Sequence, residues 1–303
     1  MTLVATLIAN PARPAITDAV LAEARRVLRT EHQPRILHGE VAAELLVPGE
    51  PEAVPALTEA LRAALAGEPI DLAVLAHDQH RRKRLFLADM DSTMIEQECI
   101  DELADMVGLK PQVAEITERA MRGEIAFEPA LRERVRLLKG LSVHVIDGLI
   151  RDAIRLTPGG RTLVATMRAH GAFTCLVSGG FTLFTGPIGA TLGFDETRAN
   201  RLAVADGQLT GAVEEPIVGA EAKRATVLDL RERLSLSPAD TLAVGDGAND
   251  LPMLAEAGLG VAFRAKPKVA QAARVRIEHG DLTALLYLQG FSAAEFAADA
   301  VSG

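Results

Sequence analysis

Two carboxylates separated by a single residue follow a short apolar run near the middle of the chain. The run is Leu85-Phe86-Leu87-Ala88, and Asp89 and Asp91 come directly after it. Four apolar residues without alternation are typical of a central parallel strand, although the pattern alone also fits a buried helix turn. In open α/β sheets the ligand crevice lies beyond the carboxyl ends of such strands. Because two like charges there need a cation or a retained proton, this tip is a candidate catalytic and metal-binding site.

Two later apolar runs end in polar residues in the same way. Residues 172–177 lead into Ser178-Gly179-Gly180, residues 241–244 lead into Gly245-Asp246-Gly247-Ala248-Asn249-Asp250, and Lys223 lies between the two. Each motif alone has a plainer interpretation, as a solvated turn or a solvated lysine. The carboxyl ends of parallel strands meet at one edge of a sheet, so the three tips together predict a single site.

In this order the motifs resemble those of the haloacid dehalogenase superfamily of phosphohydrolases, over roughly residues 84–290. Within it, their wording is similar to that of enzymes that hydrolyse free phosphoserine. The resemblance implies an α/β fold, with a Rossmann-like core and a mainly parallel sheet over residues 81–303. It also implies a helical cap inserted after the first core strand, at about residues 95–157, where four helical patterns follow one another.

The first 80 residues have a different order of patterns. Leu3–Ala9 predicts a strand, Ile16–Leu28 a helix with Thr17 as its cap, 36–47 strand material that can be split in two, Pro55–Leu65 a helix and Ile70–Ala76 a strand. This order suits a small α+β ferredoxin-like domain of the ACT-like kind. The basic run at residues 81–84 is expected to be a solvated linker at the domain boundary.

The resemblance implies a role for each residue of the strand tips. Asp89 would be the nucleophile that forms an aspartyl phosphate, and Asp91 the proton donor and acceptor. Mg²⁺, which prefers hard oxygen ligands, would be bound by the carboxylates of Asp89 and Asp246 and by the main-chain carbonyl of Asp91. The phosphate would be bound, and its site supported, by the remaining tip residues and the lysine: Ser178, Gly179, Gly180, Lys223, Asn249 and Asp250.

Substrate choice would come from the cap. Free phosphoserine carries an ammonium and a carboxylate beside its phosphate, and it therefore needs one anion and one fork-shaped cation. The resemblance assigns these roles to Glu98 and Arg134, with Met121 and Phe127 as an apolar wall. Arg132 and Arg136 are nearby competitors of Arg134.

The composition limits the partners and the compartment. With a net charge of −9, 3% aromatic residues and no tryptophan, the chain has little with which to bind a nucleic acid. Two cysteines cannot form a disulfide framework, and no stretch has the apolar length of a membrane span. We expect a cytoplasmic enzyme of a small-molecule substrate, without nucleic-acid or membrane partners. A homodimer and an amino-acid effector on the N-terminal domain are further candidate partners.

The expected activity is Mg²⁺-dependent hydrolysis of O-phosphoserine to L-serine and phosphate in serine biosynthesis, a phosphoric monoester hydrolase reaction. Two alternatives stay open. One is a phosphotransferase of the same superfamily, which passes the phosphoryl group to an acceptor alcohol such as homoserine. The other is a regulatory amino-acid-binding protein with a vestigial phosphatase half, against which the intact set of Asp89, Asp91, Lys223 and Asp246 argues.

Overall fold

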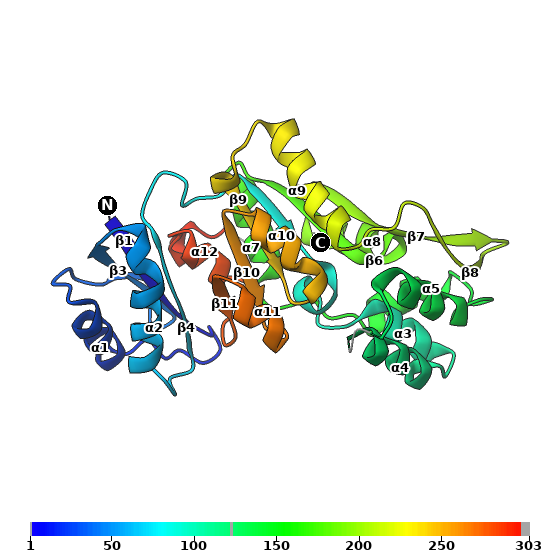
Figure 1. Ribbon diagram of the computed structural model, residues 1–303, viewed down its shortest axis with the longest axis horizontal. Helices are drawn as coiled ribbons and strands as arrows, with labels where there is room; N and C mark the ends of the chain where they lie inside the picture. The colour runs from blue at the N-terminus through cyan, green and yellow to red at the C-terminus, as the bar shows by residue number, and fades with distance from the viewer. Residues whose placement is uncertain (1, 122–123, 298–303) are drawn as a thin grey trace.

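The computed structural model describes residues 2–121 and 124–297, and in it the chain forms two β-sheets (Figure 1). A four-stranded sheet lies at the N-terminal end of the molecule. A seven-stranded sheet forms the centre, and a group of helices lies beyond it on the opposite side.

The first sheet is antiparallel and has the strand order β2-β3-β1-β4. Its elements are β1 (Thr2–Ala9), α1 (Asp18–Leu28), β2 (Arg35–His38), β3 (Ala42–Pro48), α2 (Val54–Ala64) and β4 (Ile70–Ala76). The ferredoxin-like order is confirmed, and the middle segment is split into two strands. Side chains alternate along β1: Leu3, Ala5 and Leu7 pack with α1 and α2, whereas Ile8 faces the core of the second sheet. Thr17 caps α1 by accepting the N–H of Val20.

The central sheet has the order β11-β10-β9-β5-β6-β7-β8, and every pair of neighbours is parallel except β7 and β8. Its strands are β5 (Leu85–Ala88), β6 (Phe173–Phe181), β7 (Glu196–Ala205), β8 (Gln208–Glu214), β9 (Thr241–Gly245), β10 (Leu259–Phe263) and β11 (Val275–Ile277). The apolar run after Arg84 is therefore a central strand, and the alternative of a helix turn is wrong.

Helices cover both faces of the central sheet. They are α7 (Gly160–Ala169), α8 (Thr182–Leu192), α9 (Ala220–Leu234), α10 (Leu251–Glu256), α11 (Pro267–Ala272) and α12 (Ala284–Leu288). Phe86 and Ala88 pack toward α7, α8 and α12, whereas Leu85 and Leu87 pack toward α9 and α10. Both sides of β5 are thus apolar because both are buried, which explains the run without alternation. Short 3-10 helices lie at Pro51–Ala53, Pro238–Asp240, Ala248–Asp250 and Ala293–Glu295.

The cap is inserted between β5 and α7 (Figure 1). Its helices are α3 (Cys99–Met106), α4 (Lys110–Met121), α5 (Phe127–Leu137) and α6 (Val145–Asp152). The β7–β8 hairpin runs along it, because the N–H groups of Gly140 and Val143 donate to carbonyls of Leu209 and Gly207 at 2.8 and 3.0 Å. The cap is thereby connected to the core at a third place besides its two chain ends.

Part of the basic run at residues 81–84 docks the first sheet onto the core. The expectation of a solvated linker is wrong for Arg81 and Lys83, whereas Arg82 and Arg84 are exposed. Arg81 is buried: it donates to the carboxylate of Glu44 at 2.6 Å and to the carbonyl of Leu288 at 3.2 Å. Lys83 donates to the carbonyls of His80 and Ala239, each at 2.7 Å. Arg81 thus connects the first sheet to the core, and Glu44 has a second cation, Arg35 at 2.9 Å, within the first sheet.

We predict that Glu44→Ala destabilises the protein, because it leaves the buried guanidinium of Arg81 without its carboxylate. Loss of one partner of a buried ion pair costs about 3 to 5 kcal/mol, which urea unfolding would measure. Glu59→Ala is the control: its pair with Arg62 at 2.5 Å lies at the surface, with Glu59 69% exposed. We expect it to change the free energy of unfolding by less than about 1 kcal/mol. Equal losses in the two variants would contradict the prediction.

Candidate active site

Three neighbouring strands of the central sheet end at the same edge. Ala88 of β5 lies in register with Leu176 of β6 on one side and with Val244 of β9 on the other. Asp89 follows Ala88 directly, and Ser178 and Asp246 each come two residues after the partner of Ala88. The parallel register therefore brings the three polar tips together, beyond the carboxyl ends of the strands.

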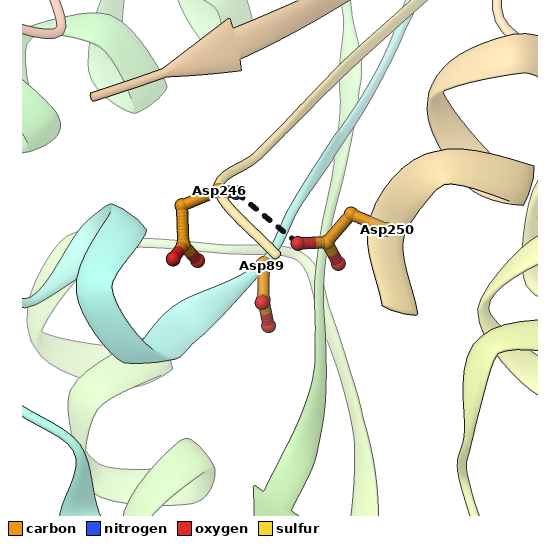
Figure 2. Close-up of side chains that lie close together, drawn as sticks. All are labelled: Asp89, Asp246 and Asp250. Atoms are coloured by element: carbon orange, nitrogen blue, oxygen red, sulfur yellow. Dashed lines mark hydrogen bonds between the residues drawn. The ribbon is translucent and has the colours of Figure 1, made fainter. Parts of the chain in front are cut away.

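Asp89, Asp246 and Asp250 form a buried cluster of carboxylates, shown in Figure 2. One oxygen atom of each lies within 4.8 Å of the others. Asp250 Oδ2 accepts the N–H groups of Asp246 at 3.1 Å and of Gly247 at 2.9 Å, which holds the loop after β9 closed. A Cβ atom at Gly245 would lie 2.4 Å from Asp250 Cγ, so this close approach requires glycine.

Lys223 extends from the first turn of α9 into this cluster. Its ammonium lies 2.6 Å from Asp89 Oδ1 and 2.7 Å from Asp250 Oδ1, and its side chain is fully buried. Burial alone would lower the pKa of Lys223, but Asp250 and Asp89 together raise that pKa above its usual value. The lysine is therefore charged at neutral pH and supplies a fixed positive charge beside Asp89.

One lysine does not neutralise three buried carboxylates. Burial raises the pKa of Asp89 well above its usual value, and Asp250 raises it further, whereas Lys223 offsets this only in part. Burial and the charge of Asp250 raise the pKa of Asp246 to about 6. This excess of negative charge on hard oxygen ligands fits a divalent cation. Asp89 and Asp246 are the available carboxylates, because both oxygens of Asp250 are already bonded to Lys223 and to backbone N–H groups.

Asp91 contacts the start of the first cap helix and the loop after β6. Its Oδ1 accepts the N–H of Cys99 at 3.1 Å, and its Oδ2 accepts the hydroxyl of Ser178 at 3.5 Å. Burial and the nearby charge of Glu98 raise the pKa of Asp91 to about 7. Asp91 can therefore both release and accept a proton near neutral pH.

The loop after β6 provides backbone donors beside Asp91. Gly180 N–H donates to Ser178 Oγ at 2.8 Å, and a Cβ atom at Gly180 would lie 2.8 Å from Asp91 Oδ2. Only glycine leaves room for this approach. Such a loop is suited to bind anionic oxygens through its N–H groups.

A pocket of about 690 Å³ lies between the strand tips and the cap. From the cap, Glu98, Phe127 and Arg134 line it. Ser92, whose φ of 55° is left-handed, donates its hydroxyl to Glu98 Oε1 at 2.7 Å. Arg134 donates to Thr117 Oγ1 at 3.3 Å. The pocket thus has an anion and a cation on its cap side.

Among the three candidate arginines, Arg134 lines the pocket in the described part of the chain. Arg132 forms a short ion pair with Glu215 at the end of the β7–β8 hairpin instead. Arg136 lies close to the same hairpin, next to Gly211. The side chain of Met121, predicted as part of the apolar wall, lies outside the described residues.

The other predicted residues lie in two layers. The surface of the pocket includes Asp89, Asp91, Gly179, Gly180, Asp246 and Asn249. Ser178, Lys223 and Asp250 are buried directly behind it. The structure brings all of these together, and their chemical roles stay predictions.

Several neighbours of the site were not singled out from the sequence: Thr93, which donates to Asp246 at 3.4 Å, Thr117, Lys266, whose ammonium lies 3.9 Å from Asp246, and Asn200, which donates to Gly179 O at 2.8 Å. Only Asn200 leaves a signal in the sequence. An asparagine inside a strand pattern is unfavourable unless its amide has buried partners.

Comparison with known proteins identifies the class to which this fold and site belong. Residues 86–255 match the model of the haloacid dehalogenase-like hydrolase family, and the chain belongs to that family. A phosphoserine phosphatase from Polaromonas sp. is 50% identical over 210 residues, which cover 68% of this chain and 89% of that protein. By this likeness the chain belongs, within the hydrolases, to the phosphoserine phosphatase family.

Two solved structures are similar to this fold. The crystal structure of a probable phosphoserine phosphatase from Vibrio cholerae has a TM-score of 0.76 and 33% identity, covering 97% of this chain and 88% of that one. A phospho-aspartyl intermediate analogue of phosphoserine phosphatase has a TM-score of 0.64 and 40% identity, covering 68% of this chain and 98% of that one. Within the described residues, no helix of this chain is long and apolar enough to cross a membrane.

We predict that Mg²⁺ raises the midpoint of thermal unfolding and that Asp246→Asn removes this shift. An ion bound only by the folded state stabilises it by about 2.7 kcal/mol at a concentration 100 times its Kd. Asp229→Asn is the matched control, because Asp229 lies at the surface of α9 and pairs with Arg198 instead. The two variants are compared by calorimetry with and without Mg²⁺. The same shift in both would exclude Asp246 as a ligand.

Proposed function

We propose that this protein is a Mg²⁺-dependent phosphoserine phosphatase, which hydrolyses free O-phosphoserine to L-serine and phosphate through an aspartyl phosphate. The observation that carries the proposal is the pocket itself. On its core side it has Asp89 and Asp91, and on its cap side it has Glu98 and Arg134. Glu98 and Arg134 match the ammonium and the carboxylate of phosphoserine, and the ammonium of Lys223, 2.6 Å from Asp89 and directly behind the pocket, provides positive charge for the phosphate.

Asp89 is the nucleophile in this proposal. Its carboxylate attacks phosphorus, an aspartyl phosphate forms, and the bond from phosphorus to the serine oxygen breaks. Lys223 at 2.6 Å offsets the negative charge of the carboxylate, and N–H groups of the loop at residues 178–180 would bind the phosphoryl oxygens. Mg²⁺, held by Asp89, Asp246 and the carbonyl of Asp91, would supply the further positive charge that the attack requires.

Asp91 moves the proton in both halves of the reaction. In the first, its protonated form gives a proton to the leaving serine oxygen; in the second, its carboxylate takes a proton from the water that attacks the aspartyl phosphate. A pKa of about 7 makes both forms available. The contacts of Asp91 with Cys99 N–H and Ser178 Oγ fix its orientation between the two steps.

The cap selects the amino acid. The substrate ammonium would bind Glu98, which Ser92 orients, and the carboxylate would bind the guanidinium of Arg134, which Thr117 orients. Burial lowers the pKa of Arg134, and the negative charges of Asp101, Glu98 and Asp91 offset this lowering only in part. A carboxylate placed there would thus meet a cation already shielded from water. Phe127 and, by resemblance, Met121 would add apolar contacts.

We place this activity in serine biosynthesis in the cytoplasm. Both cysteines are free and buried, which suits a reducing compartment. We infer a domain boundary near residue 80, with a ferredoxin-like domain at residues 1–80, the hydrolase at 81–303 and its cap at about 95–157. A homodimer and an amino-acid effector on the first domain remain part of the proposal. The N-terminal sheet and its two helices could serve either.

We predict that Asp89→Asn lowers turnover of phosphoserine by at least about 1,000-fold, because an amide cannot replace the attacking carboxylate. Asp206→Asn is the control: Asp206 lies in an exposed turn with a left-handed φ of 52°, which asparagine tolerates. Phosphate release is compared with phosphoserine consumption, with and without homoserine. Unchanged turnover in Asp89→Asn would move the chemistry elsewhere. Consumption that exceeds phosphate release only with homoserine would instead indicate a phosphotransferase.

We predict that Arg134→Ala raises the KM for phosphoserine by about 10- to 100-fold, the cost of a lost charged hydrogen bond. A small aryl phosphate has no carboxylate to lose, so its KM should change little. Arg132→Ala is the matched control on the same helix, because Arg132 pairs with Glu215 outside the pocket. Steady-state kinetics with both esters test this. Equal increases for both esters in Arg134→Ala would refute its role as the carboxylate clamp.

A further inference from the structure

Asn200 is a fully buried amide in the strand next to the phosphate loop. Its Nδ2 donates to Gly179 O at 2.8 Å and to Val218 O at 3.2 Å, while its Oδ1 accepts Val218 N–H at 2.7 Å. Asn200 is not among the described residues that line the pocket. Its contacts therefore reach the site only through other groups.

The contact with Gly179 compensates for a break in the sheet. Val177 of β6 pairs with Arg198 of β7, and the next pair is Phe181 with Asn200. Between these pairs the chain advances by four residues along β6 but by only two along β7. The residues between, 178–180, leave the ladder and form the phosphate loop. The side chain of Asn200 supplies the donor that the carbonyl of Gly179 would otherwise lack.

The same contact fixes the direction of a phosphate-binding N–H. The carbonyl of Gly179 and the N–H of Gly180 belong to one peptide unit, which is planar and trans, so they point in opposite directions. Asn200 holds the carbonyl on the buried side. The Gly180 N–H consequently points away from that carbonyl and donates to Ser178 Oγ at 2.8 Å, while Gly180 itself lines the pocket.

Asn200 also connects the loop to the helix that carries the lysine. It binds both the N–H and the carbonyl of Val218, and the next residue, Gly219, is the N-cap of α9. The carbonyl of Gly219 accepts the N–H of Lys223 at 3.0 Å. One amide thus sets the spacing between two elements that contact the phosphate.

We propose that Asn200 is a positioning residue for phosphoryl transfer, which holds the phosphate loop and the start of α9 in one fixed relation. The inference rests on the proposed phosphatase function. The site needs two donors and one acceptor on a single planar group, which an amide provides. A carboxylate of the same shape would face two carbonyl oxygens without a donor, and alanine would leave all three backbone groups unpaired.

The test compares Asn200→Asp and Asn200→Ala with the parent protein, using phosphoserine, a small aryl phosphate and orthovanadate as a phosphate-like inhibitor. Misdirecting one backbone donor should lower kcat/KM by about 10²- to 10³-fold. It should raise the inhibition constant of orthovanadate at least about 10-fold, since the loss concerns the phosphate. Because the amino-acid part is not involved, both esters should be affected to the same extent, unlike in Arg134→Ala.

Thr174→Val is the matched control. Thr174 is a fully buried residue of β6 whose hydroxyl donates to Asp195 Oδ2 at 2.9 Å, away from the phosphate loop. We expect a lower unfolding midpoint but an orthovanadate inhibition constant within twofold of the parent value. A purely structural role of Asn200 would produce that same result in its variants.

Two outcomes would overturn the proposal. One is a kcat/KM and an orthovanadate inhibition constant that both stay within twofold of the parent values in folded Asn200→Asp or Asn200→Ala. The other is failure to fold in both of these and in Asn200→Ser, which would assign the amide to the fold alone. If the parent hydrolyses the aryl phosphate but not phosphoserine, the proposed substrate fails, while the orthovanadate measurement still tests Asn200.

Discussion

The ammonium of Lys223 is the interaction on which the rest of the site depends. A fully buried charge is tolerated only with close partners, and Lys223 has two, Asp89 at 2.6 Å and Asp250 at 2.7 Å. Removal of Lys223 would leave two buried carboxylates without their shared cation. Gly245 leaves room for the side chain of Asp250, because a Cβ atom there would lie 2.4 Å from Asp250 Cγ.

In the proposed function, phosphate chemistry and recognition of the amino acid belong to different parts of the molecule. The groups that we propose bind the phosphate come from the ends of β5, β6 and β9 and from α9, which packs on the central sheet. The groups that we propose bind the ammonium and carboxylate come from the cap. Ser92 connects the two sides, because it follows Asp91 directly and donates to Glu98 at 2.7 Å. In that proposal, recognition of the substrate and placement of the proton donor are coupled through this contact.

Sequence patterns predicted most of the elements that depend on local order. Ile70–Ala76 has the predicted bounds, and the strand tips lie together as the parallel sheet requires. Helix α8 was not predicted, because Gly186, Pro187 and Gly189 lie inside it and are unfavourable in a helix interior. Its helical form comes from packing on the sheet, with Phe184 and Ile188 buried.

Contacts between segments distant in sequence could not be predicted. Nothing local to Arg81 indicates that Glu44 and the carbonyl of Leu288 will surround it, and a basic run on an acidic chain is typical of a solvated surface. Nor does the order of residues 127–137 reveal which arginine faces the pocket. That choice depends on the β7–β8 hairpin: Glu215, which follows β8 directly, pairs with Arg132, while Arg134 lines the cavity.

The first sheet is joined to the segment where the cap returns to the core. Asp71 on β4 accepts N–H groups of residues 278–280, with the contacts to Glu278 and Gly280 each at 2.7 Å. Just beyond, Leu282 N–H donates to Pro158 O at 3.0 Å, and a Cβ atom at Gly159 would lie 2.7 Å from Thr283 N. The close contact leaves this turn, with its left-handed φ of 81°, no room for a side chain. The N-terminal sheet thus binds the segment that packs against the turn at the C-terminal end of the cap, and its docking and the return of the chain from cap to core share one set of buried backbone contacts.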